Sequence, residues 1–141
     1  MTIYADTSFF VSLYVKDTHS ITADHMLRSG ERPPITALHI AEWTHAIAQQ
    51  VFRRQMTITE ADRLHRDFDD DRAARIWHTI AVPENALEVC ADLGRQYGPK
   101  LGIRTLDSLH VACALELKTK RFWTFDDRQR KLAKAAGLDT R

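Results

Sequence analysis

The sequence has 141 residues, a length typical of one domain, and we expect a single domain spanning residues 1–141. It is 44% apolar and 28% charged, as in an ordinary globular protein, and its formal net charge of +1 neither favours nor excludes a nucleic-acid partner. No stretch approaches the ~20 apolar residues of a membrane span, and the first residues lack the basic and apolar regions of a signal peptide. We therefore expect a cytoplasmic protein with no membrane partner.

The predicted elements, in chain order, are a strand at 3–5, helices at 8–16 and 21–28, a strand at 34–38, helices at 39–54 and 59–72, a strand at 76–82, helices at 84–97 and 105–117, a strand at 122–125 and a helix at 127–136. Thr59 followed by Asp62 has the spacing of a capping box, which predicts the start of the helix at 59–72. The helix at 105–117 is apolar nearly all round, so we expect it to be central and buried. Strands that alternate with helices and are apolar on both faces predict an α/β fold, with a parallel sheet covered by helices on both sides.

The two cysteines, Cys90 and Cys113, both lie in apolar segments of predicted helices. Paired cysteines are rare in the reducing cytosol. We therefore expect two buried free thiols and no disulfide.

Four carboxylates, at Asp6, Glu42, Asp107 and Asp126, each stand next to an apolar segment. Asp6 and Asp126 follow predicted strands, whose carboxyl ends form the ligand-binding edge of an open parallel sheet. Glu42 and Asp107 lie near the starts of helices that leave from the same edge. Two carboxylates about 4 Å apart repel by roughly 4 kcal/mol at an effective dielectric near 20, so a cluster of four needs protons or cations. A hard divalent cation, Mg²⁺ or Mn²⁺, is the natural partner for such oxygen ligands.

Each acid also has a purely structural explanation, which the sequence leaves open. Asp6 and Asp126 both suit helix N-caps, Asp107 suits the first turn of a helix, and Glu42 suits a solvated helix surface. Asp127 stands beside Asp126, and the sequence does not decide which of the two points inward. The Glu-x-x-His spacing at residues 42–45 is typical of di-iron bundles, but those sites need two such motifs and the chain has one.

Four segments carry a family resemblance: Tyr-Ala-Asp-Thr-Ser at residues 4–8, Ala-Glu at 41–42, Arg-Thr-Leu-Asp-Ser-Leu-His-Val-Ala-Cys-Ala at 104–114, and Trp-Thr-Phe-Asp-Asp-Arg-Gln at 123–129. With them the chain resembles the PIN-domain ribonucleases, and among these the VapC-type toxins of bacterial toxin–antitoxin pairs. The resemblance implies a PIN-like sheet of four to five strands, because many relatives continue into a further strand after the position of Gly137. It also implies an acidic groove whose catalytic and metal-site residues are Asp6, Glu42, Asp107 and Asp126, supported by Thr7, Thr124 and Asp127.

From these residues we expect an endoribonuclease that depends on Mg²⁺ or Mn²⁺ and cleaves RNA phosphodiester bonds with a metal-activated water. Asp6 and Asp107 are the expected main ligands, Glu42 a ligand or water-orienting base, and Asp126 a ligand of a second ion. Single-stranded or looped RNA is the expected substrate. The expected phosphate contacts are Arg104, Arg128 and Lys131.

The resemblance further implies a cognate antitoxin protein and a homodimer. Two other functions stay open from the sequence. One is a receiver-type phosphoacceptor domain, which is disfavoured because no adjacent acid pair follows the first strand. The other is a non-catalytic PIN-like module whose acids bind only a metal or a basic partner.

Overall fold

The structure is a computed structural model that describes residues 2–141. The chain divides into two compact units, one formed by the residues up to Ser8 together with Val82–Arg141, and the other by Phe9–Ala81. We call these the first and the second unit. No helix of the described residues is long and apolar enough to cross a membrane.

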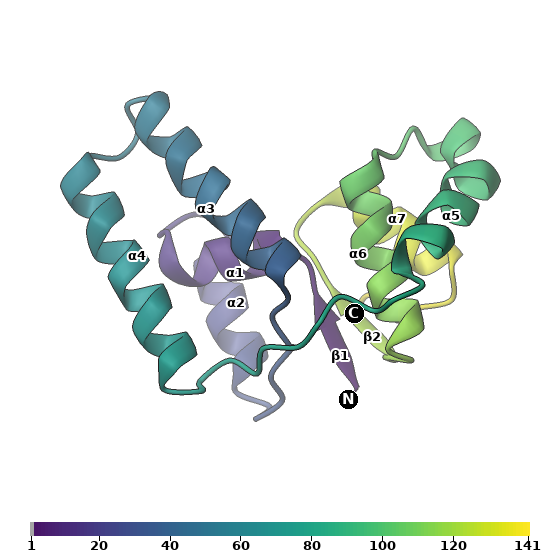
Figure 1. Cartoon of the computed structure of the whole chain (residues 1–141), viewed down its shortest axis with the longest axis horizontal. Helices are drawn as coiled ribbons and strands as arrows, with labels where there is room; N and C mark the ends of the chain where they lie inside the picture. Colours follow the sequence, from purple (N-terminus) through teal and green to yellow (C-terminus); the bar gives the residue numbers. More distant parts are fainter. Residues whose placement is uncertain (1) are drawn as a thin grey trace. The chain divides into compact units, whose positions relative to one another are not determined.

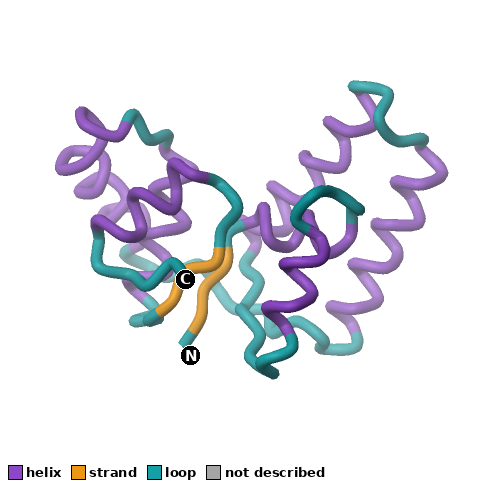
Figure 2. The backbone as a smooth tube through the Cα atoms, turned by 180° about the vertical axis from the view of Figure 1, so that it is seen from behind, coloured by secondary structure: helices purple, strands orange, loops and turns teal. Residues whose placement is uncertain are grey.

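The first unit is built on a parallel sheet. Strand β1 (Ile3–Ala5) pairs with β2 (Arg121–Trp123), and Ile3 lies opposite Arg121. Figures 1 and 2 show these two strands side by side although they are far apart in the sequence. On its other side β2 forms a parallel bridge to Asp139, whose carbonyl accepts from the Phe122 N–H at 2.8 Å. The sheet of the first unit is therefore parallel, as the sequence predicted.

Three helices complete the first unit: α5 (Ala86–Leu101), α6 (Thr105–Glu116) and α7 (Asp127–Ala135). The α6 side chains from Asp107 to Ala114 are all buried, which confirms the prediction of a central helix. The fully buried Tyr4 of β1 stacks on Phe122 of β2, with their ring centroids 5.7 Å apart. Burial of such aromatic side chains is a large part of what holds the strands in register.

The second unit contains α1 (Thr7–Tyr14), whose first two residues belong to the first unit, and then α2 (Ser20–Leu27), α3 (Ala37–Phe52) and α4 (Ile58–Ala73). Helices α3 and α4 run side by side in Figure 1, joined by a short loop. Between them Trp43 stacks on Phe68 at a centroid distance of 4.2 Å. Each of these two helices begins with a capping box.

Two of the predicted strands are reduced to a single parallel bridge. The segments at 34–38 and 76–82 are joined only by an isolated parallel bridge between Ile35 and Thr79. The first segment is short because Thr36 caps α3: its backbone N–H donates to Nδ1 of His39 at 3.0 Å, and its hydroxyl accepts from the His39 N–H. Residues 2–141 thus contain two assigned strands and two isolated parallel bridges, which confirms a parallel sheet, and the expected number of four to five strands stays a prediction.

Several helix boundaries differ from the predictions by one to four residues, and two of them have a clear physical reason. Helix α4 is capped by Thr57 with Glu60, two residues before the predicted pair of Thr59 and Asp62. Glu is the usual partner in a capping box because its longer side chain reaches back to the N-cap N–H. Helix α5 runs past Pro99 to Leu101 and is capped by Gly102, which adopts the left-handed conformation (φ 61°) favoured by glycine.

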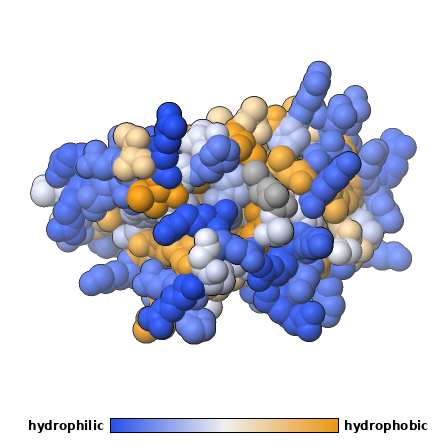
Figure 3. Space-filling view, turned by 90° about the horizontal axis from the view of Figure 1, so that it is seen from below, coloured by the Kyte–Doolittle hydropathy of each residue, from blue (hydrophilic) through white to orange (hydrophobic). Residues whose placement is uncertain are grey.

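Hydrophilic side chains cover most of the face shown in Figure 3, and apolar residues appear between them as separate patches. The large apolar residues that are more than half exposed are Ile21, Phe52, Ile58 and Leu87. Cys90 and Cys113 are free and buried, as predicted.

Candidate active site

Asp6 follows β1 directly and is only 1% exposed. Its Oδ1 accepts a hydrogen bond from the Ser8 hydroxyl at 2.6 Å, and its Oδ2 accepts one from the Thr124 hydroxyl at 2.7 Å. Both donors are uncharged, so they orient the carboxylate and stabilise its charge without neutralising it. The Ser8 hydroxyl also accepts from the Phe125 N–H, which ties the segment after β1 to the segment after β2.

Asp107 lies in the first turn of α6 and its side chain is 7% exposed. Arg104 donates to Oδ2 from its backbone N–H at 3.4 Å and from Nε at 3.3 Å, while the Gln129 amide donates to Oδ1 at 3.4 Å. These distances are longer than the 2.7–2.9 Å usual for charged pairs, so each contact is weak. The Arg104 side chain is 70% exposed, and water screens its attraction to Asp107.

Asp126 and Asp127 point in different directions. Asp126 is the N-cap of α7: its Oδ1 accepts from the Gln129 N–H at 3.0 Å, and its own N–H donates to the Thr124 hydroxyl at 2.9 Å. The Asp127 side chain is 84% exposed and pairs with Arg130 at 2.6 Å. Asp126 is therefore bonded to residues that contact the other two acids, whereas Asp127 faces solvent.

The three acids of the first unit are joined by one continuous line of hydrogen bonds. It runs from Asp6 through the Thr124 hydroxyl to the backbone of Asp126, and from the Asp126 carboxylate through Gln129 to Asp107. We call this the carboxylate line. Two of its carboxylates, Asp6 and Asp107, are nearly fully buried.

Two residues of this arrangement were not predicted from the sequence, Ser8 and Gln129. A signal for Gln129 was present, because Asp126 and Gln129 have the three-residue spacing of a capping box. No comparable signal marked Ser8, since a serine two residues after an aspartate is common in turns.

Thr7, the next residue after Asp6, lies beside a buried histidine. Its hydroxyl is 3.2 Å from Nε2 of His110, and Nδ1 of the same ring is 2.8 Å from the Tyr4 hydroxyl. Because Thr7, Tyr4 and His110 are all buried, these contacts fix the backbone on both sides of Asp6 against α6. Farther along α6, burial raises the pKa of the Cys113 thiol to about 11, so this thiol is protonated at neutral pH and is a poor nucleophile.

Glu42 belongs to α3 in the second unit and is partly exposed. Its assignment to the acidic site stays a prediction. The three predicted phosphate contacts all belong to the first unit and are exposed: Arg104 at the start of α6, and Arg128 and Lys131 three residues apart on one face of α7.

The oxygen ligands of the carboxylate line suit Mg²⁺ or Mn²⁺ in chemical type. No three His, Cys, Asp or Glu residues within residues 2–141 lie close enough together to form a ready-made metal cage. Mg²⁺ does not require one, because it keeps several waters and is usually held by one or two carboxylates together with substrate phosphates. A buried carboxylate with weak protein contacts, as at Asp107, fits this mode of binding.

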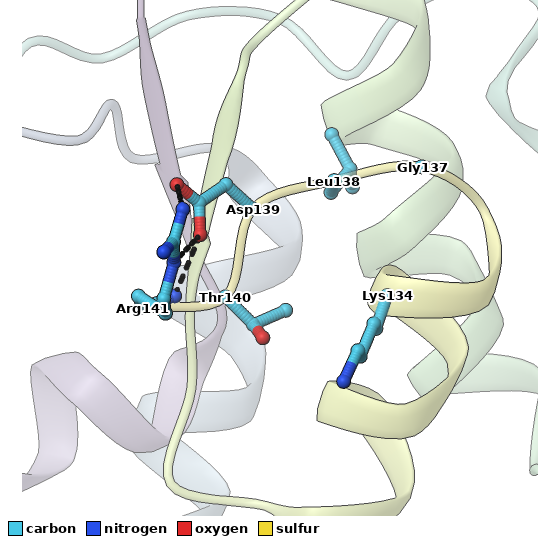
Figure 4. A pocket seen from close by; sticks show the side chains of 6 residues that line it. All are labelled: Lys134, Gly137, Leu138, Asp139, Thr140 and Arg141. Carbon is cyan, nitrogen blue, oxygen red and sulfur yellow. Dashed lines mark hydrogen bonds and ion pairs between the residues drawn. The ribbon is translucent and has the colours of Figure 1, made fainter.

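A cavity of about 520 Å³ at the C-terminal segment, drawn in Figure 4, is lined by Lys134, Gly137, Leu138, Asp139, Thr140 and Arg141. It includes none of the predicted site residues, and its acid, Asp139, is already paired with Arg141 at 3.1 Å. A smaller cavity of about 310 Å³ between α5 and the start of α6 includes Arg104 in its wall.

Comparison with known families and structures gives one family. The model of the PIN domain matches residues 3–135. No curated protein matches the sequence.

Solved structures resemble the chain over nearly its whole length at low sequence identity. The toxin VapC20 of Mycobacterium tuberculosis, described as cleaving the sarcin–ricin loop, has a TM-score of 0.69 at 16% identity, covering 99% of both chains. FitAcB of Neisseria gonorrhoeae has a TM-score of 0.68 at 17% identity, covering 99% of this chain and 96% of that one. VapBC2 of Rickettsia felis, solved with a DNA fragment from its promoter, has a TM-score of 0.70 at 14% identity, covering 100% and 98%. At these identities the likeness establishes the fold.

Proposed function

The chain belongs to the PIN domain family, and from this premise we propose that it is an endoribonuclease dependent on Mg²⁺ or Mn²⁺, the toxin of a toxin–antitoxin pair. The observation that carries the proposal is the carboxylate line, which joins three acids of the first unit. Buried carboxylates are costly unless a cation or a set of donors compensates them. Asp6 accepts short hydrogen bonds from two hydroxyl groups, and the Arg104 side chain that contacts Asp107 is 70% exposed and 3.3 Å away, so the site favours a divalent cation.

In this proposal Asp6 and Asp107 hold the divalent ion, and Asp126 holds a second ion, directly or through water. The ion supplies Lewis-acid activation of a water and neutralises charge on the scissile phosphate. Ser8 and Thr124 keep both oxygens of Asp6 in one orientation, so no reorganisation of that carboxylate is needed when an ion or substrate binds. We assign Glu42 the role of a ligand or of a base that orients the water.

The substrate we propose is single-stranded or looped RNA, whose backbone is accessible to a groove. The cleavage of the sarcin–ricin loop attributed to VapC20 is consistent with this class of target. Arg104, Arg128 and Lys131 are exposed cations of the same unit as the acids, and we propose that they contact RNA phosphates. The cavity beside Arg104 offers room for a nucleotide next to that contact.

We also propose a cognate antitoxin protein as partner, by analogy with VapBC2 and FitAcB, together with a homodimer and a cytoplasmic location. Family membership removes the receiver-domain alternative. The non-catalytic module stays the second candidate, favoured by the lack of a ready-made cage of three metal-binding residues within residues 2–141.

The test is cleavage of mixed cellular RNA by the purified chain, free of any partner, with Mg²⁺, with Mn²⁺ and with a chelator. We expect cleavage only with metal. Asp6→Asn or Asp107→Asn should reduce it by more than the roughly 10–100-fold typical of residues that merely support a ligand. Asp92→Asn is the matched control, because Asp92 is an exposed acid of α5 in the same unit.

Each variant must keep the melting temperature of the wild type within a few degrees for its activity to be compared. Cleavage at the wild-type rate by either Asp6→Asn or Asp107→Asn would contradict the assignment of the acids. A folded wild type that binds Mn²⁺ and leaves all RNA intact would favour the non-catalytic module.

A further inference from the structure

One buried amide joins two of the acids, and nothing in the family resemblance assigns it a role. We propose that Gln129 is a positioning residue of the ion site, which fixes the spacing and orientation of Asp107 and Asp126. The inference rests on the proposed function, since it takes these acids to hold a divalent ion.

The first argument is that a single residue bonds to both acids. Its backbone N–H donates to Oδ1 of Asp126 at 3.0 Å, and its side-chain Nε2 donates to Oδ1 of Asp107 at 3.4 Å. Asp126 caps α7 and Asp107 lies in α6, so Gln129 connects a carboxylate of α6 to the cap of α7 through its side chain and its backbone N–H. Arg104 bonds to the other oxygen, Oδ2 of Asp107, and together the two donors define the plane of that carboxylate.

The second argument is the chemical type of the donor. An amide N–H orients a carboxylate without cancelling its charge, whereas a lysine or arginine at this position would form an ion pair and compete with a cation. Gln129 therefore adds no second cation beside Asp107, whose ion pair with Arg104 is long (3.3 Å) and exposed on the arginine side. The amide must be oriented as observed, because the opposite orientation would set Oε1 against Oδ1 of Asp107, two acceptors facing each other.

The third argument is that Gln129 is a poor choice for packing. The residue is 7% exposed, and its Oε1 is buried without a hydrogen-bond partner among residues 2–141. A buried acceptor without a partner destabilises a fold, and each such group in a native structure calls for an explanation. A methionine would fill a similar volume with no unpaired oxygen. Gln129 thus adds little to stability, yet it bonds to two acids. A role in function explains this better than a role in folding.

The test separates a positioning role from a structural one by measuring Mn²⁺ affinity and thermal stability on the same samples. Gln129→Met removes the side-chain amide, both its nitrogen and its oxygen, at similar volume. It keeps the bond from the backbone N–H to Asp126. We expect the Mn²⁺ affinity, measured by titration calorimetry on the full chain, to fall about 10–100-fold, as for other residues that hold a metal ligand in place. The melting temperature without metal should change by less than about 4 °C, since one weak bond is lost and one unpaired oxygen removed.

Leu132→Val is the matched control, because Leu132 is fully buried on the same helix. It should lower the melting temperature and leave the Mn²⁺ affinity within about threefold of wild type, because its side chain is apolar and holds no ligand. Gln129→Leu, which also lacks the amide, takes the place of Gln129→Met if that variant does not fold.

A Mn²⁺ affinity of the Gln129 variants within about threefold of wild type would overturn the inference, and so would an equal loss in Leu132→Val. A wild type that binds Mn²⁺ but does not cleave RNA would overturn the endoribonuclease alone, and the affinity ratio would still decide the role of Gln129. A wild type that binds no Mn²⁺ would overturn both.

Discussion

At the scale of single residues, the acids of the first unit differ in how the protein holds them. Asp6 has two short bonds from hydroxyl groups, and Asp126 has a backbone bond that also caps a helix. Asp107 has only contacts of 3.3–3.4 Å. Asp6 and Asp126 are thus oriented by the fold itself, whereas Asp107 gains most from an added cation.

Asp126 has two roles, as the N-cap of α7 and as a negative charge, and two substitutions can separate their effects. Asp126→Ala should destabilise the protein by about 1 kcal/mol, because the Gln129 N–H loses its acceptor, while Asp126→Asn should cost little, since asparagine is an equally good N-cap. Both should weaken RNA cleavage, because both remove the charge. Urea denaturation and cleavage assays on the two variants measure the two effects.

Asp127→Asn is the comparison, because its exposed pair with Arg130 contributes roughly 0–1 kcal/mol. Its loss of activity should be smaller than that of Asp126→Asn. A larger loss from Asp127→Asn would show that Asp127, and not Asp126, is the acid that acts in catalysis.

The sequence singled out the acids of the first unit because each stands next to apolar residues, where an unpaired carboxylate is unusual. Their partners were harder to find. Thr124 was expected to support the site, and it bonds to Asp6. Ser8 and Gln129 were missed because a serine or glutamine at the start of a helix is ordinary, and only the folded chain reveals which carboxylate it meets.

At the scale of elements, the structure differs from the prediction where a helix cap competes with a strand. The residues at 34–38 have strand propensity, but Thr36 and His39 form a capping box that draws Ala37 into α3. Propensity in a run of five residues is a weak preference, and a cap that satisfies two helix N–H groups outweighs it. At the start of α4, Thr57–Glu60 and Thr59–Asp62 have the same spacing. The structure uses the first pair, whose glutamate has the longer side chain.

Helix α1 is tied to α4 by a network around Tyr14. The Tyr14 hydroxyl donates to Asp71 at 2.5 Å and accepts from the indole N–H of Trp77 at 2.7 Å. Burial, followed by the bond to Asp71, raises the pKa of Tyr14 above its ordinary value. The network therefore favours the protonated phenol in the folded state.

Tyr14→Phe should destabilise the protein by about 1–3 kcal/mol at neutral pH, because the buried Trp77 N–H loses its acceptor. A raised pKa in the folded state means that the wild type loses part of its stability as the pH rises above about 10, where the unfolded chain releases the proton more easily. The stability difference between wild type and variant should therefore narrow between about pH 9 and pH 11. Urea denaturation at both pH values measures it, and a difference that stays constant or grows would contradict the network.

At the scale of the whole molecule, the PIN model matches nearly the full chain while the similar solved structures share only 14–17% identity with it. The alternation of strands and helices was enough to predict the parallel sheet, since few other folds satisfy that pattern. The number and length of the strands are harder to predict, because strand pairing depends on partners distant in sequence. Whether Glu42 binds the ion also depends on residues distant in sequence, and a measurement on the whole protein tests it.

Binding of an ion to the folded state alone should stabilise the entire chain. At a Mn²⁺ concentration of about 100 times the dissociation constant the gain is about 2.7 kcal/mol, which raises the melting temperature of a chain this size by roughly 10 °C. Asp6→Asn should abolish this shift, and Glu42→Gln should reduce it if Glu42 is a ligand. Asp92→Asn should keep it, and all samples are compared at equal ionic strength. A shift in Glu42→Gln equal to that of wild type would show that Glu42 does not bind the ion, and would restrict the ligands to the acids of the carboxylate line.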